Sequence, residues 1–139
     1  MNDTGFIFLI GRVRKAIRRD FERRIAHCDL TAPQFHVLYR LWMGDGIPTS
    51  ALACDVDMDG GTITGLLDRL EARGLVRRER SSEDRRTVIL FLTDKGRAMH
   101  RELSEVLDHV SACALEGLGA ADRATLARLL ERVGENLGS

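Results

Sequence analysis

The stretch from Asp59 to Thr93, DGGTITGLLDRLEARGLVRRERSSEDRRTVILFLT, decides the fold. Its first half predicts a short helix, because the Asp59 carboxylate can accept hydrogen bonds from the free N–H groups of a first turn. Gly74 stands just past the expected end, where a left-handed cap is favoured. Four apolar residues recur at the spacing of one buried helix face: Ile63, Leu66, Leu67 and Leu70. The opposite face is polar and free to contact another molecule.

The second half of this stretch predicts a β-hairpin. Leu75–Arg80 and Thr87–Leu92 are short strand candidates, and the second is rich in β-branched and aromatic residues. The tip between them, Ser81–Arg86, is polar and ends in two arginines. A helix with a free polar face beside an arginine-tipped ribbon is typical of a winged helix-turn-helix, in which the helix enters the major groove and the ribbon a minor groove.

The residues before this stretch supply the rest of a helix-turn-helix. Thr31 and Gln34 have the spacing of a reciprocal capping box, and a helix is expected to run from there to the Gly44–Gly46 turn. Residues 48–50 open a second, shorter helix, and Asp57–Asp59 forms the turn into the helix described above. Two helices joined by a short turn have the spacing of a DNA-reading pair.

Amphipathic helices are expected at both ends of the chain. Their apolar residues repeat every three or four positions in three series: Ile10, Val13, Ile17, Phe21 and Ile25; Met99, Leu103, Val106, Val110 and Cys113; Leu126, Leu130, Val133 and Leu137. A chain this short cannot cover all of these faces with one core, so we expect a helical dimer interface; an intramolecular helical hairpin is the alternative. The sequence thus predicts a mainly α chain of the α+β kind. It forms a single domain, 1–139, with a DNA-binding lobe at 31–93 and dimerisation helices at 5–28 and 94–138.

Composition limits the function. The 139 residues have zero formal net charge, but basic residues are concentrated at Arg12–Arg24 and in the hairpin, where they could contact phosphate. No apolar run is long enough to cross a membrane, and three cysteines without framework spacing suggest reduced thiols in the cytoplasm. We find no motif of a hydrolase, a nucleotide-binding enzyme or a metalloprotease, and expect neither catalysis nor a cofactor.

Over nearly its whole length the sequence resembles the MarR family of transcription regulators. The resemblance is carried by LTAPQFHVLYRL, by LDRLEARGLV, by the Asp84-x-Arg86 wing tip and by LTDKG in register. It implies a homodimer that grips a palindromic operator and represses genes until a small ligand or an oxidant weakens binding. It also implies that Arg86 enters the minor groove, that Asp84 orients Arg86, and that Thr62 and Thr64 face the major groove.

The expected DNA contacts extend to the neighbouring positions of the same lobe. The full set is Thr49, Ser50, Gly60, Gly61, Thr62, Thr64, Gly65, Asp68, Arg69, Arg77, Arg85 and Arg86, with Asp84 orienting the wing. The three glycines each weaken the helix by up to about 1 kcal/mol relative to Ala. We therefore expect few base contacts from this helix and more contacts from backbone N–H groups and hydroxyls to phosphate.

Aromatic side chains near an arginine suggest the class of effector. A phenolic or aromatic acid could bind an aromatic surface with an arginine beside it, formed by Arg12, Phe35, His36, Tyr39 and Trp42. Two alternatives stay open within the same fold. Cys28, which follows a basic helix and adjoins His27, could sense oxidants if its pKa were lowered, and the histidines could bind zinc. Another alternative is a dimeric protein-interaction module that no longer reads DNA.

Overall fold

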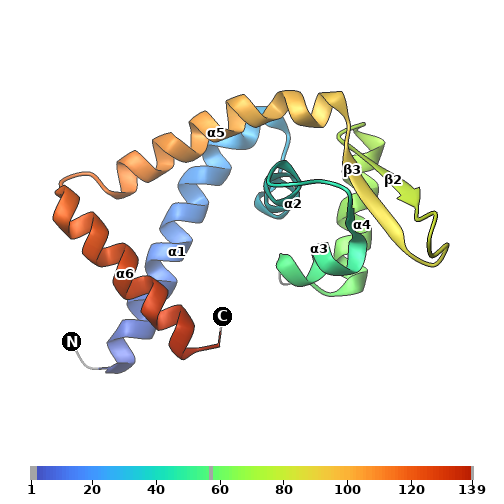
Figure 1. Cartoon of the computed structure of the whole chain (residues 1–139). Coiled ribbons are helices and arrows are strands. Elements are labelled where there is room, and N and C mark those ends of the chain that lie inside the picture. Colours follow the sequence, from blue (N-terminus) through green and yellow to red (C-terminus); the bar gives the residue numbers. More distant parts are fainter. Residues whose placement is uncertain (1–2, 57, 139) are drawn as a thin grey trace.

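The computed structural model of the chain describes residues 3–56 and 58–138 (Figure 1). In chain order the elements are α1 (Asp3–Ile25), the 3-10 helix η1 (Ala26–Cys28), α2 (Ala32–Trp42), β1 (Ile47–Pro48), α3 (Thr49–Asp55), α4 (Gly60–Ala72), β2 (Val76–Arg80), β3 (Val88–Leu92), α5 (Asp94–Ala114) and α6 (Ala120–Asn136). The predicted mainly helical, winged helix-turn-helix fold is confirmed. Asp57, which the sequence places in the turn before α4, lies outside the described residues.

Three helices begin where the sequence predicts, because a side-chain cap fixes each start. Thr31 accepts from the Gln34 N–H, and the Gln34 side chain in turn accepts from the Thr31 N–H at 2.9 Å. Asp59 accepts from the Thr62 N–H at 2.8 Å at the start of α4. Thr93 caps α5 through the Gly96 N–H at 3.0 Å.

The wing is built on a three-stranded antiparallel sheet in the order β1-β3-β2. Val76 pairs with Leu92 and Arg80 with Val88, so the hairpin has the predicted register. Both strands begin one residue later than predicted, and the two-residue strand β1, whose Ile47 pairs with Leu90, was not foreseen. Two residues are too few to show the alternation of apolar and polar side chains that marks a strand, so only the pairing with β3 identifies β1.

The core joins the inner faces of α2, α4, the sheet and the first half of α5. Its fully buried side chains include Leu38, Leu41, Leu67, Leu70 and Leu103. From α1, Phe21 and Ile25 enter this core, whereas Ile10, Val13 and Ile17 of the same predicted stripe are exposed. The apolar face of α1 therefore contributes to this core only at the C-terminal end of the helix.

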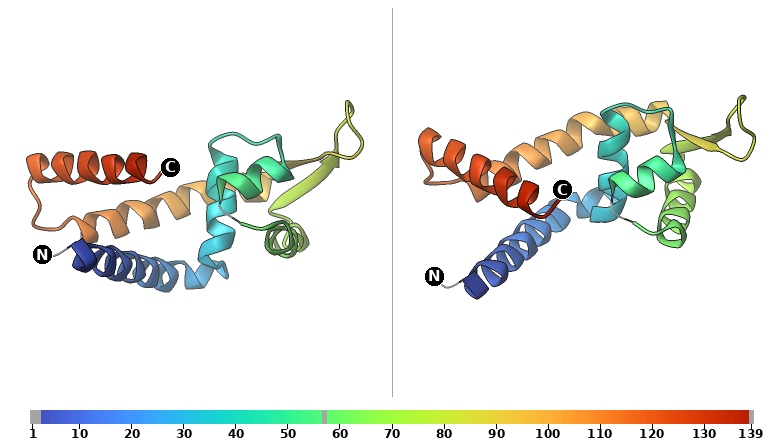
Figure 2. Two further views of the ribbon diagram at one scale, coloured as in Figure 1. Left: turned by 90° about the horizontal axis from the view of Figure 1, so that it is seen from below. Right: turned by 60° about the horizontal axis from the view of Figure 1, so that its bottom comes forward.

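The C-terminal helices differ in how they are held. On α5, Leu103 and Val110 are buried and Met99 and Val106 pack beside them, but Cys113 is exposed, contrary to its predicted place on the apolar seam. α6 contributes no buried residue among those described. α1 and α6 overlap in Figure 1, but the views in Figure 2 show them as separate segments at the end of the molecule away from the wing. None of the described helices is long and apolar enough to cross a membrane.

Candidate nucleic-acid interface

The helix pair α3–α4 presents α4 to solvent along one whole face. Its inner face is fixed by the four leucine and isoleucine residues that the sequence predicted to be buried. The positions between them are all exposed, and they are the residues expected to meet DNA: Gly60, Gly61, Thr62, Thr64, Gly65, Asp68 and Arg69. The structure therefore places this set of predicted residues on the exposed side of α4, where Thr64 faces the wing and Arg69 faces α1.

The hydroxyl donors of this face are already used within the helix. Thr62 Oγ1 donates to Asp59 at 2.7 Å, and Thr64 Oγ1 donates to the Gly60 carbonyl at 2.7 Å. These bonds leave the hydroxyl oxygens as acceptors rather than donors toward an incoming molecule. The Thr62 hydroxyl and N–H also hold the pKa of the Asp59 carboxyl below its ordinary value, with the backbone N–H as the larger cause.

The wing tip is organised by Asp84. Its carboxylate accepts from the Arg86 N–H at 3.0 Å and from the Thr87 hydroxyl at 2.9 Å, and these two donors lower the pKa of Asp84. Asp84 thus fixes the backbone at Arg86 and leaves the guanidinium group free. Within the described part of the chain, neither Arg85 nor Arg86 forms an ion pair, and both are exposed.

A hollow of about 370 Å³ lies between α3, α4 and the wing. It is lined by four of the predicted DNA contacts, Thr49, Ser50, Thr64 and Arg86, together with Arg78 and others. Thr49 also donates to the Val88 carbonyl at 3.3 Å and so ties the start of α3 to the wing. The two helices and the ribbon therefore converge on one concave, partly basic surface.

Arg78 belongs to this surface but was not among the predicted DNA contacts. Its guanidinium contacts Asp68 at 2.6 Å, Glu71 at 3.5 Å and the Thr64 carbonyl at 3.3 Å, which joins β2 to the outer face of α4. Asp68, predicted as a DNA contact, is therefore engaged by an arginine of the same chain. The alternation of side chains along the strand could have predicted this position, since Arg78 lies on the same strand face as buried Val76.

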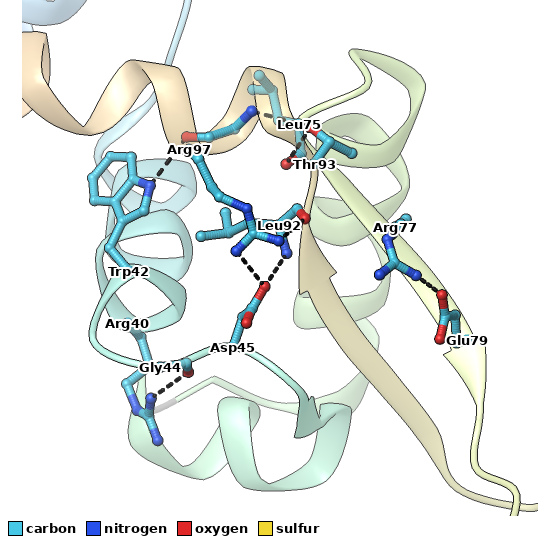
Figure 3. A network of polar contacts seen from close by, with 11 residues as sticks. Arg40, Trp42, Gly44, Asp45, Leu75, Arg77, Glu79, Leu92, Thr93 and Arg97 are labelled. Carbon is cyan, nitrogen blue, oxygen red and sulfur yellow. Dashed lines mark hydrogen bonds and ion pairs between the residues drawn. The ribbon is translucent and has the colours of Figure 1, made fainter.

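Two other predicted contacts lie elsewhere. Arg77 stacks over the Phe91 ring at 4.5 Å and forms an ion pair with Glu79, shown in Figure 3, so its charge is partly matched. Arg69 lines a second hollow of about 530 Å³, which reaches from α4 to Arg18 and Glu22 of α1 and to the start of α2. Arg69 is thus placed beside α1 rather than in the hollow that contains Arg86.

The aromatic residues expected to bind an effector do gather on α2. The Phe35 ring lies 4.5 Å from Phe21, 5.8 Å from Tyr39 and 6.1 Å from Trp42. Phe35 is itself a core residue, while His36 and Tyr39 are exposed. The Trp42 indole N–H donates to the Gly96 carbonyl at 3.0 Å (Figure 3). Arg12 is exposed on α1, and no contact among the described residues joins it to this cluster.

The three cysteines are free, and their surroundings correct the sequence predictions. Cys113, which the sequence places in the apolar series of its helix, is exposed, and Cys54 is exposed as well. The pKa of Cys28 is raised, first by burial and then by the charge of Glu102, which is the opposite of the lowering that oxidant sensing at this residue would require. A raised pKa reduces the thiolate fraction on which oxidation depends, so the structure disfavours Cys28 as a fast oxidant sensor.

Curated proteins similar to this chain are transcription regulators. The family model described as MarR family matches residues 30–88. The HTH-type transcriptional regulator TtmR of Methylorubrum extorquens is 41% identical over 97 residues, which are 70% of this chain but only 50% of TtmR. The HTH-type transcriptional regulator MgrA of Staphylococcus aureus is 32% identical over 127 residues, which cover 91% of this chain and 85% of MgrA.

Solved structures extend the similarity to a complex with DNA. A mutant of MarR from E. coli, crystallised with operator DNA, superposes with a TM-score of 0.83 at 30% identity over 90% of either chain. BpsR of Bordetella bronchiseptica, whose DNA binding is regulated by 6-hydroxynicotinic acid, superposes with a TM-score of 0.85 at 28% identity and covers 94% of this chain. With the exposed face of α4 and the arginine-tipped wing, these matches show that the chain belongs to the MarR family of DNA-binding, winged helix-turn-helix transcriptional regulators.

Proposed function

We propose that the protein is a homodimeric repressor that binds a palindromic operator and is released by a small-molecule effector, and that it acts in the cytoplasm. The observation that carries the dimer is the exposure of large apolar side chains on the two terminal helices. On α1 these include Ile7, Phe8 and Val13, and on α6 they include Leu129 and Leu130. The N-terminal half of α1 and all of α6 lie at the end of the molecule away from the wing (Figure 1), so a second copy can cover their apolar side chains without blocking the DNA-binding surface.

The division of the chain follows from this arrangement. Residues 31–93 form the DNA-binding lobe, and residues 5–28 and 94–138 supply the dimer interface. The N-terminal half of α5 also belongs to the core of the lobe, because Gly96 and Leu103 are buried there. α5 therefore connects each lobe rigidly to the interface, and the spacing of the two lobes follows the geometry of the dimer.

In the proposed complex α4 enters the major groove and the wing reaches the adjacent minor groove. The free guanidinium of Arg86 suits the negative potential of a narrow minor groove. On α4 the absent side chains of Gly61 and Gly65 allow the backbone to approach the DNA closely, and Thr62 and Thr64 offer oxygens that accept hydrogen bonds. We expect DNA shape and phosphate contacts to contribute much of the specificity.

An aromatic acid is the effector class that we favour. BpsR, which resembles this chain over most of its length, responds to a hydroxylated pyridine carboxylic acid. In this chain Tyr39 and His36 provide exposed ring surface beside Phe35 and Trp42, and Arg12 is the cation that we assign to the carboxylate. Binding there would act by favouring a lobe spacing that no longer matches two successive major grooves.

A fluorescence-anisotropy titration with DNA from upstream of the protein's own gene tests the proposal. We expect specific binding by a dimer, a loss of affinity on Arg86→Ala, and release on addition of an aromatic acid. Arg101→Ala, an exposed change on α5, serves as a matched loss of positive charge. Binding that is indifferent to DNA sequence and to salt would instead favour the protein-interaction module, which the engaged hydroxyls of α4 make the second candidate.

A further inference from the structure

We propose that His27, Cys28 and Glu102 form a binding site for a zinc-like divalent ion, and that its occupancy is transmitted to α4 through Arg73. The site itself stands on the geometry of this chain alone. Its influence on DNA binding rests on the proposed function, which deepens here to a second, metal-linked mode of control.

The three donor atoms lie within 4.8 Å of one another. The Cys28 Sγ is 3.3 Å from His27 Nε2 and 3.6 Å from Glu102 Oε1, while the His27 and Glu102 atoms are 2.7 Å apart. Zinc bound tetrahedrally, with bonds of about 2.3 Å to sulfur and about 2.0–2.1 Å to nitrogen and oxygen, separates its ligand atoms by about 3.3–3.6 Å. Two of the three separations already fit, and the third must open by about 0.6 Å once an ion replaces the proton held between His27 and Glu102.

The donor set selects the class of ion. A thiolate with an imidazole is a soft to borderline set that favours zinc over magnesium or calcium, which take oxygen ligands. Three protein ligands leave a fourth position open to water or to a further side chain. A shallow hollow of about 350 Å³ beside the site is lined by His27, Glu102, Glu105 and His109, and provides access from solvent. Arg24, which also lines it, is matched in charge by Asp20 at 2.7 Å.

The site links segments that are far apart in the chain. His27 and Cys28 belong to η1, at the junction of α1 and α2, and Glu102 belongs to α5. An ion held by all three would fasten this junction to the long helix. Asp29, which follows directly, has the left-handed backbone conformation with φ of 53°, so the chain turns sharply at the site. A change in the position of η1 is therefore confined to the short turn at residues 26–29, here called the η1 corner.

Arg73 connects that corner to the DNA-binding helix. Its guanidinium donates to the Cys28 carbonyl at 2.8 Å and also to the Asp29 carbonyl. Arg73 is itself the C-terminal cap residue of α4, and its own carbonyl accepts from Lys95 of α5 at 2.9 Å. Any movement of the η1 backbone on metal binding thus acts on the end of α4 through the Arg73 side chain, and α4 is the helix that we place in the major groove.

The first experiment measures metal binding without DNA. Wild-type protein is titrated with Zn²⁺ by competition with a chromophoric chelator, and with Co²⁺ to detect thiolate charge-transfer absorption. We expect one ion per chain, with affinity reduced about tenfold or more in Cys28→Ser and in Glu102→Gln. Cys54→Ser, which removes an exposed cysteine outside the site, is the matched control and should bind as wild type. Thermal unfolding of each variant without metal verifies that it folds.

Two outcomes would overturn the site. One is wild-type protein that binds no more zinc than Cys28→Ser, and the other is full binding with no thiolate absorption for cobalt. The second experiment repeats the DNA titration with and without Zn²⁺. We expect zinc to change the operator affinity of the wild-type protein severalfold and to leave the operator affinity of Cys28→Ser unchanged. Arg73→Gln should still bind zinc, but its operator affinity should not respond to the metal.

The two proposals can fail separately. Zinc binding at the site with no change in wild-type operator affinity would overturn the coupling through Arg73. If the protein shows no specific operator under any condition but still binds zinc through Cys28, then the proposed function fails and the metal site stands.

Discussion

The carbonyl oxygen of Leu75 lies directly against Gly96, and a Cβ added to Gly96 would stand 2.1 Å from it. The same carbonyl accepts hydrogen bonds from the Thr93 N–H and the Thr93 hydroxyl, both at 3.1 Å. Gly96 in turn provides the carbonyl that accepts from Trp42. This contact brings the start of α5, the turn after α4 and the end of α2 to one point, visible in Figure 3.

Gly96→Ala should therefore destabilise the protein by about 2–3 kcal/mol, because backbone atoms cannot move aside as a flexible side chain can. Gly65→Ala, on the open face of α4 where no atom lies within 4 Å, should instead stabilise it by up to about 1 kcal/mol. Urea denaturation of both variants gives the comparison. Equal stability of the two variants would show that the approach of Leu75 to Gly96 is not tight.

Removing the wing arginine should weaken operator binding without affecting the fold. We expect Arg86→Ala to lose about 10- to 100-fold in affinity, the range for one specific arginine contact. Asp84→Ala should lose affinity as well, although it removes a negative charge, because Asp84 fixes the backbone at Arg86. Anisotropy titrations at two salt concentrations are the measurement. Tighter binding by Asp84→Ala would mean that its charge, rather than its hydrogen bonds, dominates.

Stability should fall in acid partly through Asp59. Its pKa is lowered in the folded state from the ordinary 3.8, so its contribution is complete above that value and is lost as the pH falls through the lower folded value. Asp59→Asn keeps a capping oxygen but does not titrate, so its stability should depend less on pH below about 4. Urea denaturation at a series of pH values compares the two proteins. Parallel pH profiles would contradict this role of the carboxylate.

A charge on the apolar face of α6 should separate the proposed dimer. Leu130 is 46% exposed in the single chain, so Leu130→Glu should leave the protomer folded but shift it toward the monomer. Ala124→Glu adds the same charge on the opposite face of α6, by the helical spacing of 100° per residue, and should remain dimeric. Sedimentation velocity at micromolar concentration distinguishes them. Identical sedimentation of both variants would rule out α6 as part of the interface.

Local chemistry explains what the sequence could predict. The caps at Thr31, Asp59 and Thr93 and the buried face of α4 depend on residues at most a few positions apart, so pattern alone identified them. The strand β1 and the ion pairs of Arg78 depend on partners that only the fold brings close. The approach of His27 to Glu102 likewise joins η1 and α5, and no spacing rule predicts it.

The burial of individual side chains was the other feature that the sequence could not predict. Cys113 follows the apolar repeat of α5, but it lies past the point where the core ends. Its position on the helix was predicted correctly, whereas its exposure to solvent was not. Cys28 follows a basic helix, but local burial and Glu102 outweigh that charge. In both cases the sequence gives the position of a residue on its element but not what covers it.

No side chain of α6 is required by the core of its own protomer. The segment is therefore free to diverge in sequence without harming the lobe that contacts the operator. In the proposed dimer, compatibility between the apolar faces of two such C-terminal helices would contribute to deciding which sister polypeptides pair. Choice of partner and choice of DNA target would then depend on different segments of the chain.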